Sequence, residues 1–117
     1  MTPQDVINGA RDLLQDPAGG SPRWLDADMV RWINEALEII WDDRADVRFD
    51  DDGDLINFEE ADSSELDEEL FLSNQWRSIV IDYVAYRCYQ RDAADPENLR
   101  LSKNHYEHFR EGLGIDA

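Results

Sequence analysis

Positive charge is scarce in this 117-residue chain, which has 11 Lys and Arg residues against 28 Asp and Glu residues. Lys103 is the only lysine. Phosphate binding needs clusters of Lys and Arg, so a formal net charge of -17 argues against direct recognition of nucleic acid. We expect the acidic surface to face DNA without binding it, or to imitate DNA for a DNA-binding partner.

Cysteine, long hydrophobic runs and glycine-rich loops are also missing or rare. Cys88, the single cysteine, excludes an internal disulfide framework, and its apolar neighbours predict a buried thiol. No apolar run approaches the roughly 20 residues of a membrane span, and residues 1–14 hold no secretory signal. Gly19 and Gly20 stand alone, so the sequence has no phosphate-binding loop. We therefore expect a soluble intracellular protein with no enzyme activity and no cofactor.

Apolar residues are nevertheless plentiful, and their spacing is helical. The chain is 42% hydrophobic and has four Trp, which predicts a single folded domain over residues 1–117. Apolar side chains three and four residues apart predict four helices, at about 3–15, 26–43, 74–94 and 96–111. The third is the most hydrophobic, so we expect it at the centre of a mainly α, four-helix bundle-like fold.

Helix-capping residues mark where these helices begin and end. Thr2, Asp26 and Asp95 are the expected N-caps, because short polar side chains satisfy free amides at a helix start. A proline follows both Thr2 and Asp95, as is typical of the first helical position. Gly112 or Gly114 is expected to end the last helix.

Between the second and third helices lies an acidic insert of about residues 45–72. Residues 42–69 hold 14 acids and two arginines, which gives -12 of the net -17. Strand-like apolar residues flank an Asp-rich turn in which Gly53 supplies a positive φ, so we predict a β-hairpin. An isolated hairpin is marginally stable in water, so this one is expected to need a neighbour, such as another subunit.

Two patterns resemble metal sites without completing one. Counted from Arg48, the insert matches an EF-hand loop at Asp50, Asp52 and Glu59, but Arg48 itself occupies the first ligand position. His105 and His108 are three residues apart on a helix, yet no cysteine or third histidine completes a set. We expect a solvated acidic turn, surface histidines and no metal site.

Several segments together resemble a known family. They are the capped Asp-Val-Ile-x-x-Ala-Arg-x-Leu-Leu-x-Asp helix (5–16), Arg-Trp-Leu-Asp-Ala-Asp (23–28), Trp-Ile-Asn-Glu-Ala (32–36), Ile-Asp-Tyr-Val-Ala-Tyr-Arg-Cys-Tyr (81–89), Asp-Ala-Ala (92–94) and Ser-x-x-His-Tyr-x-x-Phe (102–109). The order resembles the head-to-tail connector (adaptor) proteins of tailed bacteriophages. The resemblance covers nearly the whole chain except about residues 45–70.

The resemblance implies a structural role. Such adaptors form a ring, usually twelvefold, beneath the portal protein, extend the DNA channel and dock the next tail or stopper protein. It implies a location in the virion, with the host cytoplasm before assembly, and DNA that passes without specific binding. The implied portal-binding residues are Tyr106, Phe109, Arg110, Leu113 and Ile115. The implied channel-lining or subunit-contacting hairpin residues are Phe49, Asp50, Asp51, Asp52 and Asp54.

Two other functions remain open at this point. The net charge also suits an acidic DNA mimic that inhibits a DNA-binding protein. The carboxylates of Asp50, Asp52, Asp54 and Glu59 also suit a divalent-ion binding module. In a ring, acids on the channel wall would repel DNA phosphate, and repulsion between copies predicts assembly that is sensitive to salt.

Overall fold

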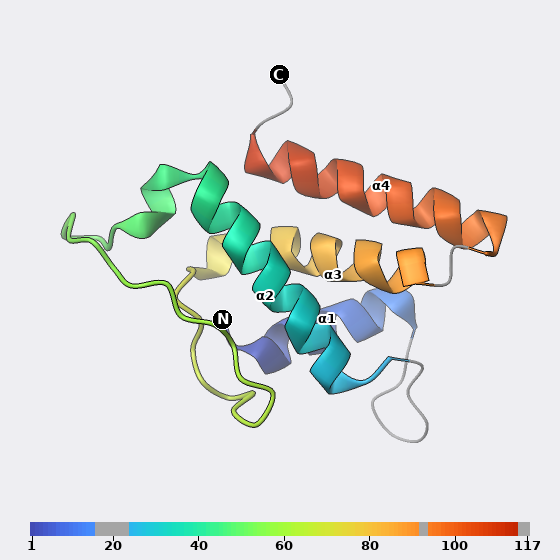
Figure 1. Ribbon diagram of the computed structural model, residues 1–117, viewed down its shortest axis with the longest axis horizontal. Coiled ribbons are helices and arrows are strands. Elements are labelled where there is room, and N and C mark those ends of the chain that lie inside the picture. Colours follow the sequence, from blue (N-terminus) through green and yellow to red (C-terminus); the bar gives the residue numbers. More distant parts are fainter. Residues whose placement is uncertain (16–23, 92–93, 115–117) are drawn as a thin grey trace.

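Four α-helices form the body of the protein (Figure 1). The computed structural model describes residues 1–15, 24–91 and 94–114. The α-helices are α1 (Pro3–Leu14), α2 (Asp26–Asp43), α3 (Arg77–Arg91) and α4 (Pro96–Leu113), and the 3₁₀ helices are η1 (Ala45–Arg48) and η2 (Asn74–Trp76). The predicted mainly helical, bundle-like fold is therefore confirmed. None of the described helices is long and apolar enough to cross a membrane.

Two of the three predicted N-caps are confirmed. The Thr2 hydroxyl accepts a hydrogen bond from the Asp5 amide at 3.1 Å, and the Asp5 carboxylate accepts one from the Thr2 amide at 3.0 Å. Asp95 caps α4 by accepting from the amide of Glu97 at 2.9 Å. These bonds satisfy amides that a helix start would otherwise leave without a partner.

The third predicted cap, Asp26, is wrong. Leu25 is the N-cap of α2, and Asp26 is its first helical residue. The Asp26 carboxylate instead accepts a hydrogen bond at 2.6 Å from the buried guanidinium of Arg11 on α1. The Asp26 side chain, which was predicted to cap α2, therefore forms an ion pair between α1 and α2 instead. At the other end of the fold, α4 ends at Gly114, in the left-handed conformation.

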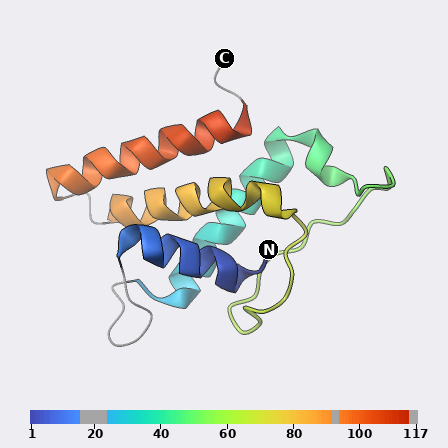
Figure 2. The same ribbon diagram turned by 180° about the vertical axis from the view of Figure 1, so that it is seen from behind.

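Helix α3 lies at the centre, as predicted. It packs against α1, α2 and α4, and Figures 1 and 2 show it between α4 and α1, with α2 crossing it. Val80, Val84 and Cys88 on α3 are completely buried. Helix α4 contributes Phe109 and Leu113 to the same core. The bundle therefore depends on α3, which every other α-helix contacts.

The predicted β-hairpin is not shown. The described residues contain no strand, and the insert has a single antiparallel bridge between Phe49 and Leu55. Beyond Ile56 the chain runs back along the helices instead of pairing with residues 42–48. Its backbone there bonds to helix residues, including the Gln4 amide, which donates to the carbonyl of Leu66 at 3.0 Å. Contacts with the bundle thus replace the second half of the hairpin ladder.

Candidate functional site

The most distinctive surface is an arm that projects from the bundle beyond the end of α2 (Figure 1). We call residues 45–58 the acidic arm; it consists of η1, the Asp-rich turn and the extended residues that follow. Its acids are Asp46, Asp50, Asp51, Asp52 and Asp54, and all five are exposed. A concentrated negative charge is therefore held away from the core.

Local hydrogen bonds fix the turn at the tip of the arm. The Asp50 carboxylate accepts from the amides of Asp52 and Asp54, each at 2.9 Å. Backbone bonds join the Asp50 amide to the Asp54 carbonyl at 2.9 Å and the Gly53 amide to the Asp50 carbonyl at 3.0 Å. Gly53 has a φ of 83°, which a side chain would strain. The tip is therefore a defined structure that needs no second strand.

Two large apolar side chains are left uncovered at this tip. Phe49 and Leu55 form the antiparallel bridge, and their side chains are 49% and 70% exposed. By contrast, Val47, Ile56 and Phe58 on the same arm are half-buried. Because the described part of the chain leaves this apolar pair on a fixed turn largely exposed, the pair is suited to contact another protein.

Arg48 holds the base of the arm against α2. Its guanidinium donates to the carbonyls of Trp41 at 2.9 Å and Asp42 at 3.1 Å, and it lies 5.8 Å from the centroid of the Trp41 ring. Arg48 is also the residue at the first position of the EF-hand-like pattern. Its side chain closes the end of a helix, so the turn has a cation in a structural role where a calcium loop has its first ligand.

Arg44 connects the arm to α4. Its guanidinium donates to Asp46 at 2.9 and 3.0 Å and to the carbonyl of Leu113, in the last turn of α4, at 3.1 Å. It also lies 5.1 Å from the centroid of the Trp76 ring. The hydrogen bond from Arg44 lowers the pKa of the Asp46 carboxyl below its ordinary value. One side chain thus contacts the arm, η2 and the end of α4.

The segment after the arm, residues 59–72, is tied to α1 and α2. The side-chain amide of Asn34 donates to the Ala61 carbonyl at 3.0 Å and accepts from the Ala61 amide at 2.7 Å. The Leu70 amide donates to the Met1 carbonyl at 2.8 Å, and the Met1 amino group pairs with Glu69 at 2.6 Å. These bonds fix both ends of an otherwise irregular acidic segment.

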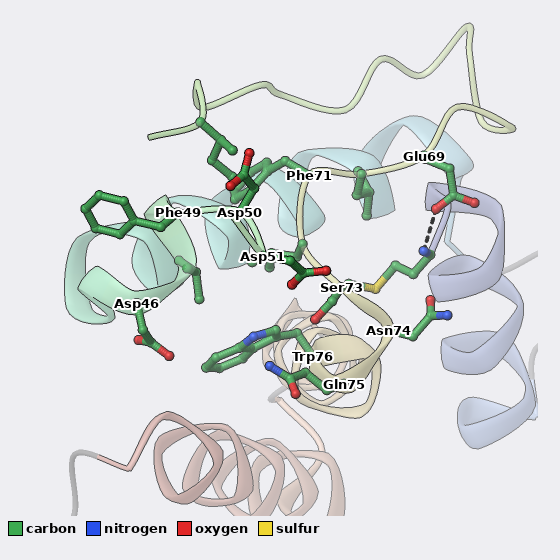
Figure 3. A pocket seen from close by; sticks show the side chains of 15 residues that line it. Asp46, Phe49, Asp50, Asp51, Glu69, Phe71, Ser73, Asn74, Gln75 and Trp76 are labelled. Carbon is green, nitrogen blue, oxygen red and sulfur yellow. Dashed lines mark hydrogen bonds and ion pairs between the residues drawn. The ribbon is translucent and has the colours of Figure 1, made fainter. Parts of the chain in front are cut away.

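A groove separates the arm from this returning segment (Figure 3). Its volume is about 660 Å³. Asp46 and Phe49 line it on the arm side, and Glu69 and Trp76 line it on the other. Its lining mixes apolar side chains with acids and with the polar residues Ser73, Asn74 and Gln75. Such a surface is suited to an extended segment that carries both apolar and basic side chains.

The five residues that the resemblance assigns to portal binding have very different environments. Tyr106 is exposed, and Arg110 is half-buried. Phe109 and Leu113 are each only 1% exposed, because they pack in the core under α3. Ile115 lies outside the described residues. Among the described members of the set, Tyr106 is therefore the aromatic side chain that a partner can reach without moving α4.

The fold also brings together a cluster that sequence reasoning missed. Asp82 on α3 lies beside His105 on α4, with 3.1 Å between the Asp82 carboxylate oxygen and the His105 Nδ1 atom. His108 is close enough for the three side chains to hold one metal ion. The histidine spacing was visible in the sequence, but the pairing of α3 with α4 that supplies Asp82 was not.

Comparison with known proteins gives no relative. No protein-family model matches the chain, and neither a characterised protein nor a solved structure is significantly similar to it. The resemblance to connector proteins therefore stays a prediction that depends on the sequence segments alone.

Proposed function

We propose that this protein is a structural head-to-tail adaptor of a tailed bacteriophage. In this proposal it forms a ring, twelvefold if it follows the usual pattern, beneath the portal protein. The ring extends the DNA channel and docks the next tail or stopper protein. The observation that supports the proposal most is the projecting acidic arm, whose fixed tip leaves Phe49 and Leu55 uncovered.

A projecting arm suits a ring because each subunit of a ring uses two different surfaces. The tip of one arm would contact the helical body of the next copy, and closure of the ring would leave no free end. Charge favours this arrangement over arm-to-arm contact. Residues 42–69, which are the end of α2, the arm and most of the returning segment, carry -12, whereas the remaining residues include nine of the 11 cations and carry only -5. The acidic arm of one copy and the helical body of the next therefore repel each other less than two arms do.

The acids of the arm also suit the wall of a DNA channel. Carboxylates at Asp50, Asp51, Asp52 and Asp54 would repel phosphate, so DNA would slide through without specific binding. The protein would then work in the virion, at the head–tail interface.

Portal binding is assigned to the end of α4. Tyr106 and Arg110 are at the surface or half-buried, whereas Phe109 and Leu113 are core residues of the bundle. We assign the first contact to Tyr106 and Arg110. Phe109 and Leu113 would join only if the last turns of α4 left α3, which would expose their apolar side chains to the portal.

The test is the mass of the purified protein, alone and mixed with its candidate portal, by native mass spectrometry or light scattering. A ring, formed either alone or on the portal, is the expected result. Phe49→Ala with Leu55→Ala should weaken assembly without loss of helical signal in circular dichroism. Leu13→Ala, at a residue 45% exposed on α1, is the matched control and should assemble normally. A monomer indifferent to the portal would overturn the proposal.

A second function is favoured by the same charge. An acidic DNA mimic would present the arm to the basic surface of a DNA-binding enzyme and compete with DNA. In that case Phe49→Ala with Leu55→Ala would have little effect, whereas Asp50→Asn with Asp52→Asn would weaken binding. Competition with DNA for a basic enzyme, together with a protein that stays monomeric, would favour the mimic over the ring.

A further inference from the structure

Three potential metal ligands meet on the face where α3 and α4 pack side by side. Asp82 comes from α3, and His105 and His108 come from successive turns of α4. One ligand atom from each lies within 4.8 Å of the other two. The described residues of two helices thus bring together a carboxylate and both histidines of the chain.

The distances are close to those of a bound transition metal. Zinc binds nitrogen and oxygen at about 2.0–2.1 Å, so neighbouring ligands of a tetrahedral site are about 3.4 Å apart. Asp82 and His105 already meet at 3.1 Å. His108 is exposed, so a rotation of its side chain can bring its ring nitrogen from within 4.8 Å of the other two ligand atoms to the distance that a metal site needs.

The surroundings hold part of this cluster in place and leave part of it open. The Tyr89 ring stacks on the His105 ring at 5.7 Å with an angle of 8°, which fixes the plane of the imidazole. The side chains of His105 and Asp82 are 14% and 24% exposed, whereas His108 faces solvent. Two ligands are therefore oriented by packing, and a water molecule can complete the coordination from the open side.

We propose that Asp82, His105 and His108 bind a divalent transition-metal ion, with Zn²⁺ as the reference ion. Two imidazoles and one carboxylate form a donor set that suits Zn²⁺, Co²⁺ or Ni²⁺ better than Ca²⁺ or Mg²⁺, which prefer oxygen alone. The acidic arm has the opposite preference, because its exposed charged groups are carboxylates. The bound ion would join α3 to α4 and hold α4 against the bundle. This site does not depend on the proposed adaptor function.

The experiment is calorimetric titration of protein without a polyhistidine tag, using Zn²⁺ as the probe. Because both histidines of the chain lie in the cluster, any histidine-dependent binding reports on this site alone. We expect one Zn²⁺ per chain, a visible absorption band of tetrahedral Co²⁺, and a higher melting temperature with Zn²⁺. His108→Gln and Asp82→Asn should each weaken binding by about tenfold or more.

Two variants keep the result interpretable. His108 is exposed, so His108→Gln should keep the metal-free melting temperature and lose only the rise with Zn²⁺. Asp50→Asn changes a carboxylate of the acidic arm and should bind Zn²⁺ like the wild type. No binding at millimolar Zn²⁺, or binding that His108→Gln leaves unchanged, would show that Asp82 and His105 form only an ion pair between helices. Binding lost in Asp50→Asn would assign the ion to the arm. Each of these results would overturn the proposal.

Discussion

Individual arginine side chains decide where the acidic arm lies. Arg48 closes the end of α2, and Arg44 joins Asp46 to the end of α4. Neither role follows from the sequence, because each guanidinium bonds to backbone carbonyls that only the folded chain brings near. At this scale the sequence did identify the capping residues Thr2 and Asp95, whose partners are three and two residues away along the chain.

Arg44→Ala should lower the free energy of unfolding by about 1–2 kcal/mol, because it removes hydrogen bonds to a carboxylate and a carbonyl. Urea denaturation monitored by circular dichroism measures the change. Arg31→Ala is the matched control, since the Arg31 side chain is 72% exposed and lies 4.0 Å from Asp28. Its effect should stay within about 0.5 kcal/mol. Equal effects of the two variants would show that the Arg44 contacts add nothing to stability.

Tyr83 predicts a loss of stability in alkali. Burial, and then the hydrogen bond that its hydroxyl donates to Glu35 at 2.8 Å, raise the pKa of the Tyr83 phenol above its ordinary value of 10.0. The unfolded chain therefore releases this proton at a lower pH than the folded chain. The tyrosine's contribution is complete below about pH 10 and is lost as pH rises further, by at most about 1.4 kcal/mol per pH unit.

Urea denaturation between about pH 9 and 11 tests this slope. Tyr83→Phe should reduce the slope, because its ring has no proton to release. Tyr106→Phe, at an exposed tyrosine, is the control and should keep the wild-type slope. A Tyr83→Phe variant with the full wild-type slope would assign the alkaline sensitivity to other groups.

Among whole elements, the helices were predictable and the insert was not. Helical spacing and caps are local, so the observed bounds of α1, α2 and α4 lie within two residues of the approximate predicted ones. The insert depends on distant partners. Within residues 59–72, Ala61 bonds to Asn34, which is 27 positions away, and Glu69 bonds to Met1, which is 68 positions away. The amide of Gln4 also donates to this segment. Local strand propensity therefore suggested a hairpin where contacts with the bundle decide the path.

Asn34→Ala should release this returning segment from α2. Ala61 would lose the partner of both its amide and its carbonyl, at a cost of about 1–2 kcal/mol. Hydrogen exchange followed by mass spectrometry should show faster exchange around residues 59–66, with α3 still protected. Asn8→Ala is the control, since the exposed Asn8 side chain bonds to the side chain of Gln4 on its own helix and not to the returning segment. Unchanged exchange in Asn34→Ala would show that the segment is held by its other contacts.

At the scale of the whole molecule, charge decides how copies can meet. A net charge of -17 per chain makes copies repel, and salt weakens this repulsion beyond a Debye length of about 10 Å at 0.1 M. Sequence alone could predict the amount of charge. Sequence also located -12 of this charge in residues 42–69. The projection of the acidic arm from the helical body, and the meeting of Asp82 with the two histidines, required the fold.

In the proposed function, formation of the ring should therefore rise with salt at low ionic strength. Light scattering across a sodium chloride series measures the fraction assembled, and Asp50→Asn with Asp52→Asn should shift the curve to lower salt because fewer charges repel. Glu107→Gln with Glu111→Gln, on exposed positions of α4, removes the same charge elsewhere and is the control. Equal shifts for both pairs would mean that total charge, and not the arm, controls assembly.

Arg44 physically links the acidic arm to the end of α4. The same guanidinium bonds to Asp46 in the arm and to the Leu113 carbonyl, so a ligand that pulls the last turn of α4 away also removes a restraint on the arm. Thermodynamic reciprocity then requires that a neighbour which displaces the arm changes affinity at the end of α4 by the same factor. A subunit built in this way would register at one surface whether the other is occupied, which is the property that sequential assembly needs.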